Sequence, residues 1–201
     1  MGSGAERIPR DDRVNHAVIQ IVDADTRKAT RVATIPAYPL HGALSLAIAP
    51  DRRSIAMLAP VGAIQPARGQ RVPYNDAEWL VEKRLGFIDL AAPGAAVRWV
   101  ELPVEARYPV ELLGWAPDAR SVAFRARAAL PDTTTPLFVA SADTLAAQRI
   151  AAPLTVGTAS AGPYPDDRAA MWVDARQLLV KGRPDGRDDW WLVKAGAAPV
   201  N

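Results

Sequence analysis

The sequence contains an internal repeat, and no other feature constrains its fold as strongly. The segment Leu46–Met57 returns later in the chain as Leu113–Phe124, with proline, aspartate, arginine and serine in the same register. A third, decayed copy at Met171–Val180 keeps the aspartate and the arginine but has lost the proline. Because each unit of a repeat protein buries its faces against its neighbours, the repeating unit decides the architecture.

Each copy predicts a β-hairpin. Apolar residues lead into a turn in which proline fixes φ and aspartate binds its own backbone, and small or β-branched residues follow directly. A third apolar strand comes after each hairpin, and a turn-rich stretch then leads into a short fourth strand. The third strands are predicted at Leu85–Leu90, Pro136–Ala140 and Trp190–Val193, and a matching strand at Ala17–Asp23 precedes the first hairpin. Four strands per repeat are typical of a β-propeller blade.

The strands add up to part of a propeller. Two strands fall in residues 17–35, complete four-strand repeats in 44–102 and 111–151, and three strands in 169–194. We therefore predict an all-β fold of four-stranded antiparallel blades, about three of them, in residues 16–201, after a flexible segment at 1–15. Since propellers close with about 4–8 blades, such a partial ring would expose blade edges through which the chain could self-associate.

Four of the tryptophans fall at informative places in this repeat. Trp115 and Trp172 stand just ahead of the hairpin turns at equivalent positions, so we expect them to pack between blades. Trp190 and Trp191 lie together on the last third strand, where neighbouring side chains point to opposite faces. We expect one of these two rings to be exposed if no further blade follows.

Composition excludes several classes of function. The 201 residues include 24 lysines and arginines against 22 aspartates and glutamates, scattered along the chain, so no basic footprint for nucleic acid is present. There is no cysteine for a disulfide or a thiolate metal site, and no apolar run reaches the roughly 18 residues that span a bilayer. The carboxylates of Arg183–Asp189 do not match the spacing of a calcium loop, and no glycine loop suited to a phosphate follows a predicted strand. We therefore expect neither a metal nor a cofactor.

The sequence offers no catalytic residues. Its histidines are His16, which opens a predicted strand, and His41, which lies in a predicted turn. Thr158–Gly162 approaches the G-x-S-x-G pattern of a nucleophile elbow, but threonine replaces the first glycine and no strand precedes it. A hydrolase needs a nucleophile beside a base, so we expect that the chain is not an enzyme by itself.

The longest stretch without repeat character, Val61–Lys83, leaves two interpretations open. One is a solvated excursion of the chain. The other is a recognition element, since long loops in compact domains are usually functional or disordered. In that case Asn75 or Asp76 could begin a short helix that places Glu78 and Glu82 on one exposed face. The side chains presented to a ligand or partner would be Glu78, Glu82, Arg68, Arg71 and Tyr74.

The hairpins resemble those of a known group of propellers. Ile48–Ala56 and Gly114–Phe124 are similar to the repeat W-S-P-D-G-(K/R)-x-I-A-F of TolB-like propellers. The same repeat builds the amino-terminal propeller of the prolyl oligopeptidase family of serine peptidases. The glycine that usually follows Pro-Asp is Arg52 or Ala119 here, and the third copy has no proline. These departures indicate a diverged propeller.

The resemblance implies one of two functions. In the peptidase family the propeller caps an α/β-hydrolase domain and selects peptide substrates, so this chain would be a non-catalytic gating module whose hydrolase domain lies beyond Asn201. Glu78 and Glu82 would then contact the peptide. In the alternative, the chain is a TolB-like propeller that binds protein partners. Bacterial propellers of this kind are often exported, so the resemblance implies a periplasmic or secreted location, with the cytoplasm as the alternative.

Overall fold

The computed structural model describes residues 15–37, 44–63, 81–127, 136–150, 170–182 and 189–195. Within these ranges the chain forms β-strands and one 3₁₀ turn, η2 (Val104–Ala106). The strands form four sheets in which all hydrogen-bonded neighbours are antiparallel and consecutive in the chain. The predicted all-β architecture of antiparallel four-stranded blades is confirmed.

The four sheets follow one another along the sequence. The first pairs β1 (Asn15–Val22) with β2 (Ala29–Ala37). The second contains β3 (Ser45–Ile48), β4 (Ser54–Ala63), β5 (Val81–Asp89) and β6 (Arg98–Trp99). The third contains β7 (Tyr108–Trp115), β8 (Ser121–Arg127), β9 (Leu137–Ser141) and β10 (Ala147–Arg149). The fourth contains β11 (Ala170–Trp172), β12 (Gln177–Gly182) and β13 (Asp189–Lys194).

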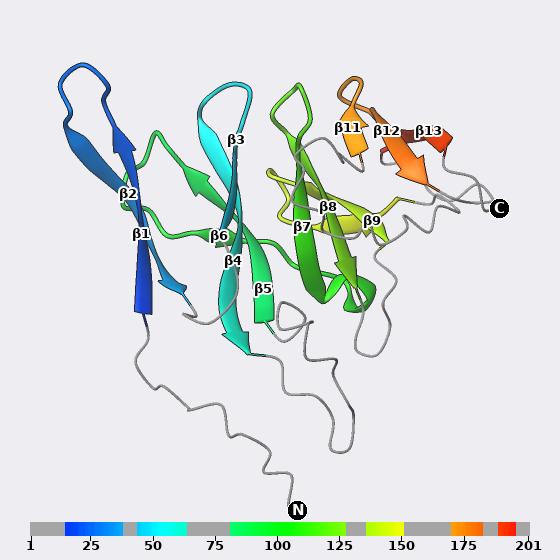
Figure 1. The fold of residues 1–201 in the computed structure, drawn as a ribbon, viewed down its shortest axis with the longest axis horizontal. Coiled ribbons are helices and arrows are strands. Elements are labelled where there is room, and N and C mark those ends of the chain that lie inside the picture. The colour runs from blue at the N-terminus through cyan, green and yellow to red at the C-terminus, as the bar shows by residue number, and fades with distance from the viewer. Residues whose placement is uncertain are drawn as a thin grey trace, which may run out of the picture.

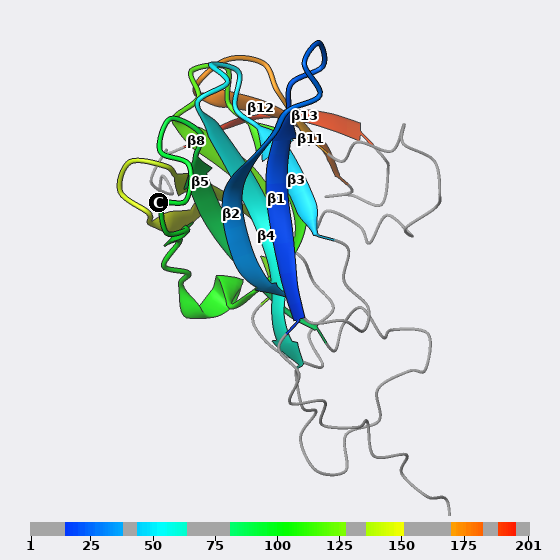
Figure 2. The ribbon, with the colours of Figure 1, turned by 90° about the vertical axis from the view of Figure 1, so that its left-hand side faces the viewer.

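The sheets stand side by side like blades in an open arc. Figure 1 shows them in chain order from the blue β1–β2 pair at the left to the orange and red β11–β13 sheet at the upper right, with their hairpin turns at the upper end. Figure 2 looks at the first sheet from its outer side and shows it lying over the sheet of β3, β4 and β5. The arrangement agrees with a partial propeller.

Alternation of side chains along each strand holds the blades together. In β4, Ile55 and Met57 enter the core shared with β1 and β2, whereas Ala56 and Leu58 enter the core shared with β7–β10. In β8, Ala123 points onward in the same way, into the core shared with β11–β13. Successive side chains of a strand point to opposite faces, so a strand that is covered on both faces needs apolar residues at even and odd positions alike. This explains the near-continuous apolar runs.

Aromatic rings fill the core between the second and third sheets. Phe87 of β5 and Trp115 of β7 lie with ring centroids 5.3 Å apart, and Phe124 of β8 stacks on Phe138 of β9 at 5.5 Å. All three phenylalanines are fully buried. Such pairs add roughly 0.5–1.5 kcal/mol beyond the area they bury. The expectation that Trp115 packs between blades is confirmed.

The Pro-Asp hairpins are built alike. Ile48 pairs with Ile55 and Trp115 pairs with Val122, so the two hairpins share one register next to the turn, and a bulge between Leu112 and Gly114 then shifts β7 by one residue. In the first turn the Asp51 carboxylate accepts a hydrogen bond from the Arg53 amide at 2.9 Å, and the second and third turns repeat this bond at Asp118 and Asp174. The carbonyl of the same arginine accepts the amide that follows each third strand, at 2.7–2.8 Å. The predicted equivalence of the hairpins is confirmed.

The third hairpin shows what the lost proline changes. Its turn closes between the Val173 amide and the Gln177 carbonyl, one residue sooner than the turn between Ala116 and Ser121. The longer turns place Arg52 and Ala119 at φ of 60°, a left-handed conformation that no residue of the third turn adopts. Arg52 and Ala119 therefore adopt a backbone conformation that only glycine adopts without steric cost.

The β1–β2 turn identifies which half of a blade these strands form. In it, the Asp23 carboxylate accepts the amides of Asp25 and Thr26, and Arg27 has φ of 57°. The turn between β9 and β10 repeats this pattern with Ser141 as the acceptor and Leu145 at φ of 58°. The first sheet therefore corresponds to the third and fourth strands of a blade. Hydrogen bonds from the Thr26 backbone and hydroxyl, the largest causes, lower the pKa of the Asp23 carboxyl.

Arg52 and Arg53 provide a matched test of the turn. Both are exposed neighbours of the same type, but only Arg52 has positive φ. We expect Arg52→Gly to raise the free energy of unfolding by about 0.5 kcal/mol, because relief of left-handed strain exceeds the entropic cost of glycine. Arg53→Gly should lower it by about 0.5–1 kcal/mol. Urea denaturation measures both, and equal losses in the two variants would contradict the assignment.

Gly86 of β5 allows a second test of the packing. A Cβ built there would lie 2.7 Å from Val97 Cγ1 and 2.9 Å from Trp99 Cε3, whereas at Gly62 the nearest atom is Glu82 Oε2 at 3.5 Å. We expect Gly86→Ala to lower the free energy of unfolding by about 2 kcal/mol through overpacking. Gly62→Ala, the control in the same sheet, should change it by less than about 0.5 kcal/mol. A harmless Gly86→Ala would show that β6 does not pack on β5 in this way.

Candidate functional site: an apolar ledge beside the edge of β1

The strand β1 has an edge without a ladder partner. β5 and β9, which occupy the same place in their blades, are paired on both sides, each with an antiparallel second strand. In the part of the chain that the structure describes, β1 pairs with β2 alone. The other edge of β1 therefore presents backbone N–H and C=O groups of an eight-residue strand to its surroundings.

Two apolar side chains of β3 lie beside this edge. Leu46 and Ile48 are 47% and 64% exposed, and they pair across the strand with Met57 and Ile55. Those two partners are buried in the core shared with β1 and β2. Leu46 and Ile48, which we call the ledge, therefore extend the apolar face of that core beyond the point where β1 covers it.

The other blades show how this position is normally covered. Trp115, the equivalent of Ile48, is only 8% exposed and donates its indole N–H to the Ala47 carbonyl of the preceding blade at 2.8 Å. Trp172 repeats this bond to the Gly114 carbonyl at 3.0 Å. Ile48 has no indole, and the sheet that precedes it contains only β1 and β2 among the described residues. The exposure of the ledge is thus a local departure from a rule that the rest of the chain follows.

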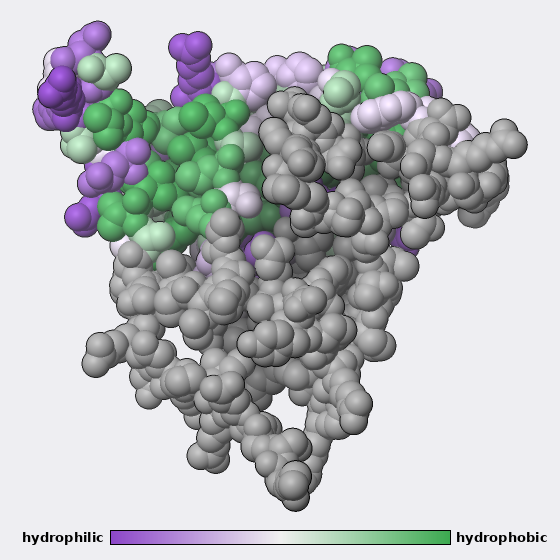
Figure 3. Space-filling model, in the orientation of Figure 1, coloured by the Kyte–Doolittle hydropathy of each residue, from purple (hydrophilic) through white to green (hydrophobic). Residues whose placement is uncertain are grey.

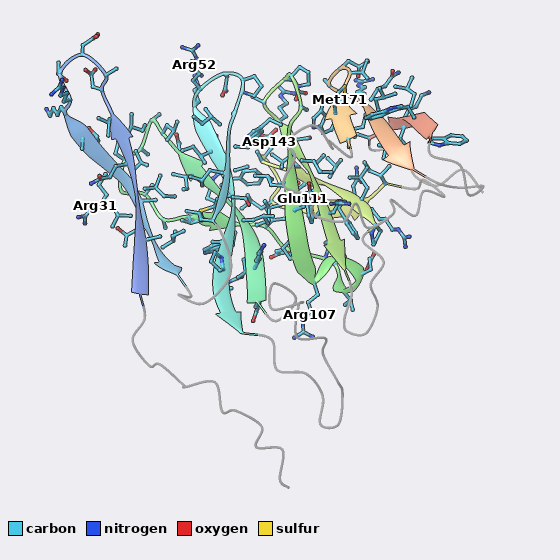
Figure 4. All side chains as sticks on the ribbon, in the orientation of Figure 1. Arg31, Arg52, Arg107, Glu111, Asp143 and Met171 are labelled. Carbon is cyan, nitrogen blue, oxygen red and sulfur yellow. The ribbon has the colours of Figure 1, made fainter. Side chains whose placement is uncertain are left out.

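The molecular surface is apolar on the side of the molecule where β1 and β3 lie, as Figure 3 shows. Val18 and Ile21 of β1 are likewise each more than two-fifths exposed. Arg52 projects from the turn at the upper end of β3, and Arg31 points away from the sheets at the side (Figure 4). Contiguous exposed apolar area with a charged rim is typical of a protein contact surface.

A second apolar surface lies at the other end of the arc. Met171 marks this end in Figure 4. Its exposed apolar residues are Met171, Val173, Trp190, Trp191 and Leu192. The expectation that one of the two neighbouring tryptophans would be exposed is wrong, because Trp190 and Trp191 are 46% and 39% exposed. Trp191 pairs with buried Val180, but β13 is an edge strand in the described sheet and leaves the ring half uncovered.

An ion pair between a buried arginine and a glutamate whose side chain is 39% exposed lies within the third sheet. Arg125 of β8 is 9% exposed and pairs with Glu111 of β7, which is directly opposite across the strands. Its Nε and Nη1 atoms are buried without a hydrogen-bond partner among the described residues. The equivalent of Arg125 in the first repeat is Leu58, which is fully buried. The arginine therefore takes a core position at a desolvation cost that a leucine avoids.

The residues nominated from the sequence are only partly placed. Glu82 is exposed on β5, close to Gly62. The short helix that would have joined Glu78 and Glu82 on one face is wrong for Glu82, because residues 81–89 alternate as a strand against β4. The remaining nominated residues lie outside the described part of the chain: Arg68, Arg71, Tyr74 and Glu78.

Residues considered for other chemistry are similarly placed. His16 lies in β1, while His41 and residues 158–162 lie outside the described ranges. No group of three or more potential metal ligands occurs among the described residues. No helix in those ranges is long and apolar enough to cross a membrane.

Sequence reasoning missed the ledge. Leu46 and Ile48 alternate with small residues as in any half-buried strand, and nothing in that pattern says which face is covered. One signal was present, because the repeat carries tryptophan where the first copy has Ile48. The second and third copies place an indole between blades at this position, and the first copy does not. This difference indicates that the first copy has a different neighbour there.

Comparisons with known proteins find similar solved structures. No protein-family model matches the chain, and no curated protein sequence matches it. Among solved structures, it is similar to one described as "putative TolB from Agrobacterium tumefaciens", with 12% identity and a TM-score of 0.38. The match covers 90% of this chain and 66% of that one. The fold assignment therefore rests on the blades themselves.

The ion pair gives a prediction about what Arg125 costs. We expect Glu111→Leu to lower the free energy of unfolding by about 2 kcal/mol, because it leaves a buried guanidinium unpaired. Arg125→Leu, which copies Leu58, should change it by less than about 1 kcal/mol in either direction. Thermal and urea denaturation of both variants measure this. Equal destabilisation by the two substitutions would show that the pair itself stabilises the blade interface.

Proposed function

We propose that the chain is a non-catalytic, protein-binding β-propeller segment and that it binds its partner through the ledge and the adjoining edge of β1. The observation that supports this most directly is the exposure of Leu46 and Ile48 at a position where the other blades are covered. An apolar surface next to unpaired strand backbone suits a polypeptide, which can offer both apolar side chains and backbone hydrogen bonds.

The peptidase-gating alternative stays a prediction of the resemblance. It requires an α/β-hydrolase domain beside this segment, and no family match supports that parent. Glu78 and Glu82 keep their suggested contact with a peptide only within this alternative. A periplasmic or secreted location and self-association through blade edges also stay predictions. We give preference to the protein-binding function because it draws on residues whose contacts are described.

Selection of peptides tests the proposed function. Random peptides long enough to span the eight residues of β1 are displayed and selected against the whole chain, and the recovered sequences are measured by fluorescence anisotropy. We expect Leu46→Asp with Ile48→Asp to raise the Kd by at least about tenfold, because two apolar contacts become charged. Both side chains are half exposed, so the fold should survive the change.

The matched control changes the other apolar surface. Met171→Asp with Leu192→Asp introduces the same charges at exposed residues of β11 and β13 and should leave the Kd unchanged. Failure to recover any peptide, or equal loss in both double variants, would contradict the proposed site. Turnover of chromogenic peptide substrates by the chain would contradict the non-catalytic part of the proposal.

A further inference from the structure

We infer that the partner binds by strand addition: an extended segment of its chain runs antiparallel to β1 along the free edge and sets apolar side chains on the ledge. This inference rests on the proposed function and specifies its mode of binding. The occupant is a strand of another polypeptide with apolar residues at every second position.

The chain itself contains the template for this complex. β5, β9 and β13 each pair with the second strand of their blade, and each of these ladders is antiparallel. The turn that follows β1 matches the turn that follows β9, so β1 has the same place in its blade. A strand added to β1 would complete the ladder that every other third strand has within the described residues.

The same template says what the added strand must carry on one face. In the second sheet, Ala56 and Leu58 of β4 share a core with Trp115 of the following blade. Ile48 takes the place of Trp115 in the first repeat, so we expect the added strand to meet Ile48 as β4 meets the strand of Trp115. Isoleucine is smaller than tryptophan, which leaves space for a side chain larger than Ala56. The partner should therefore prefer leucine, methionine or phenylalanine at the position that faces Ile48.

Other occupants fit the surface less well. Residues 1–14, which precede β1 in the chain, carry apolar side chains only at Met1, Ala5, Ile8 and Val14, and these do not alternate. The outer edge strand β13 of a second copy would bring Trp190 and Trp191, but it would join opposite ends of two arcs into an open-ended polymer. Either occupant would be recognised in the experiments below.

A peptide taken from the first Pro-Asp hairpin serves as the first probe. It reproduces residues 51–59, which are three turn residues and the first six residues of β4, with two lysines added at its carboxyl end for solubility, and a second version carries phenylalanine in place of Ala56. Amide hydrogen exchange of the labelled whole chain is followed by NMR with and without peptide. We expect the alternate amides of β1 that do not bond to β2 to exchange at least about tenfold more slowly in the complex. The amides of β13, an edge strand at the other end, are the control and should not change.

Backbone methylation tests the ladder directly. N-methylation of the peptide at one set of alternate residues should weaken binding by at least about tenfold, because those amides would face β1, and methylation at the other set should have little effect. A mode of binding that uses side chains alone would show no such alternation.

Changing the size of the facing side chains, one in the peptide and one at position 48, tests whether the peptide contacts the ledge. With the unaltered chain, the phenylalanine version should bind several-fold more tightly than the alanine version. Ile48→Trp restores the ring present at Trp115 and should reverse that order, because the ring fills the space that phenylalanine would occupy. A chain whose preference stays the same after Ile48→Trp would contradict contact between the peptide and Ile48.

The outcomes separate this inference from the proposed function. Selected peptides that depend on Leu46 and Ile48, together with β1 amides that gain no protection, would leave the protein-binding site standing and overturn strand addition. Slow exchange of the edge amides in the free chain would show that the chain covers its own edge, and light scattering that grows with concentration would show a second copy there. Both results would overturn the inference.

Discussion

Alternation of side chains across strands that are covered on both faces is the constraint on which this structure depends. Each central strand must send apolar residues in both directions, as β4 does with Met57 toward one neighbour and Leu58 toward the other. A one-residue slip of register would exchange the two sets and break both cores. The indole bonds from Trp115 and Trp172 to the preceding blade then fix how far one sheet slides along the next. The blades therefore depend on one another as a stack, and exposed apolar side chains lie at both of its ends.

The sequence predicts the parts of the fold that follow from local chemistry. The Pro-Asp turns, the alternation after them and the count of strands per repeat led to the blades, because each depends on residues close together in the chain. The helix predicted near the end of Val61–Lys83 was wrong at Glu82. A spacing of four residues from Glu78 suggests one face of a helix as readily as it suggests a strand. Val81, Leu85 and Phe87 continue the ladder with β4 and decide the matter through contacts distant in sequence.

The candidate site was harder to predict, because the exposure of its side chains depends on the position of strands that are distant in the sequence. Leu46 and Ile48 have the sequence pattern of core residues, and only the position of the β1 edge in space exposes them. Arg125 is the converse case. Its charge suggests a solvated surface, but it occupies the position of buried Leu58 in the repeat and is itself buried. Comparison between copies of a repeat carries this information better than periodicity within one copy. Positions where copies differ in kind, isoleucine for tryptophan or arginine for leucine, are where the blades have different surroundings.

The free energies of burial, hydrogen bonding and association limit the affinity of a complex at the ledge. Full burial of Leu46 and Ile48 from their half-exposed state contributes about 2–3 kcal/mol, because complete burial of such a side chain is worth roughly 1.5–3 kcal/mol. An eight-residue edge offers about eight ladder hydrogen bonds, because every second residue presents both its N–H and its C=O, and each bond has a net contribution of about 0.5–1.5 kcal/mol. Association and ordering of the partner strand cost about 4–15 kcal/mol, which offsets most of this gain, so these contacts alone give a weak and reversible complex. A tight partner must therefore make contacts besides the ledge and the ladder, and the exposed Val18 and Ile21 of β1 are apolar side chains on the strand with which it would pair.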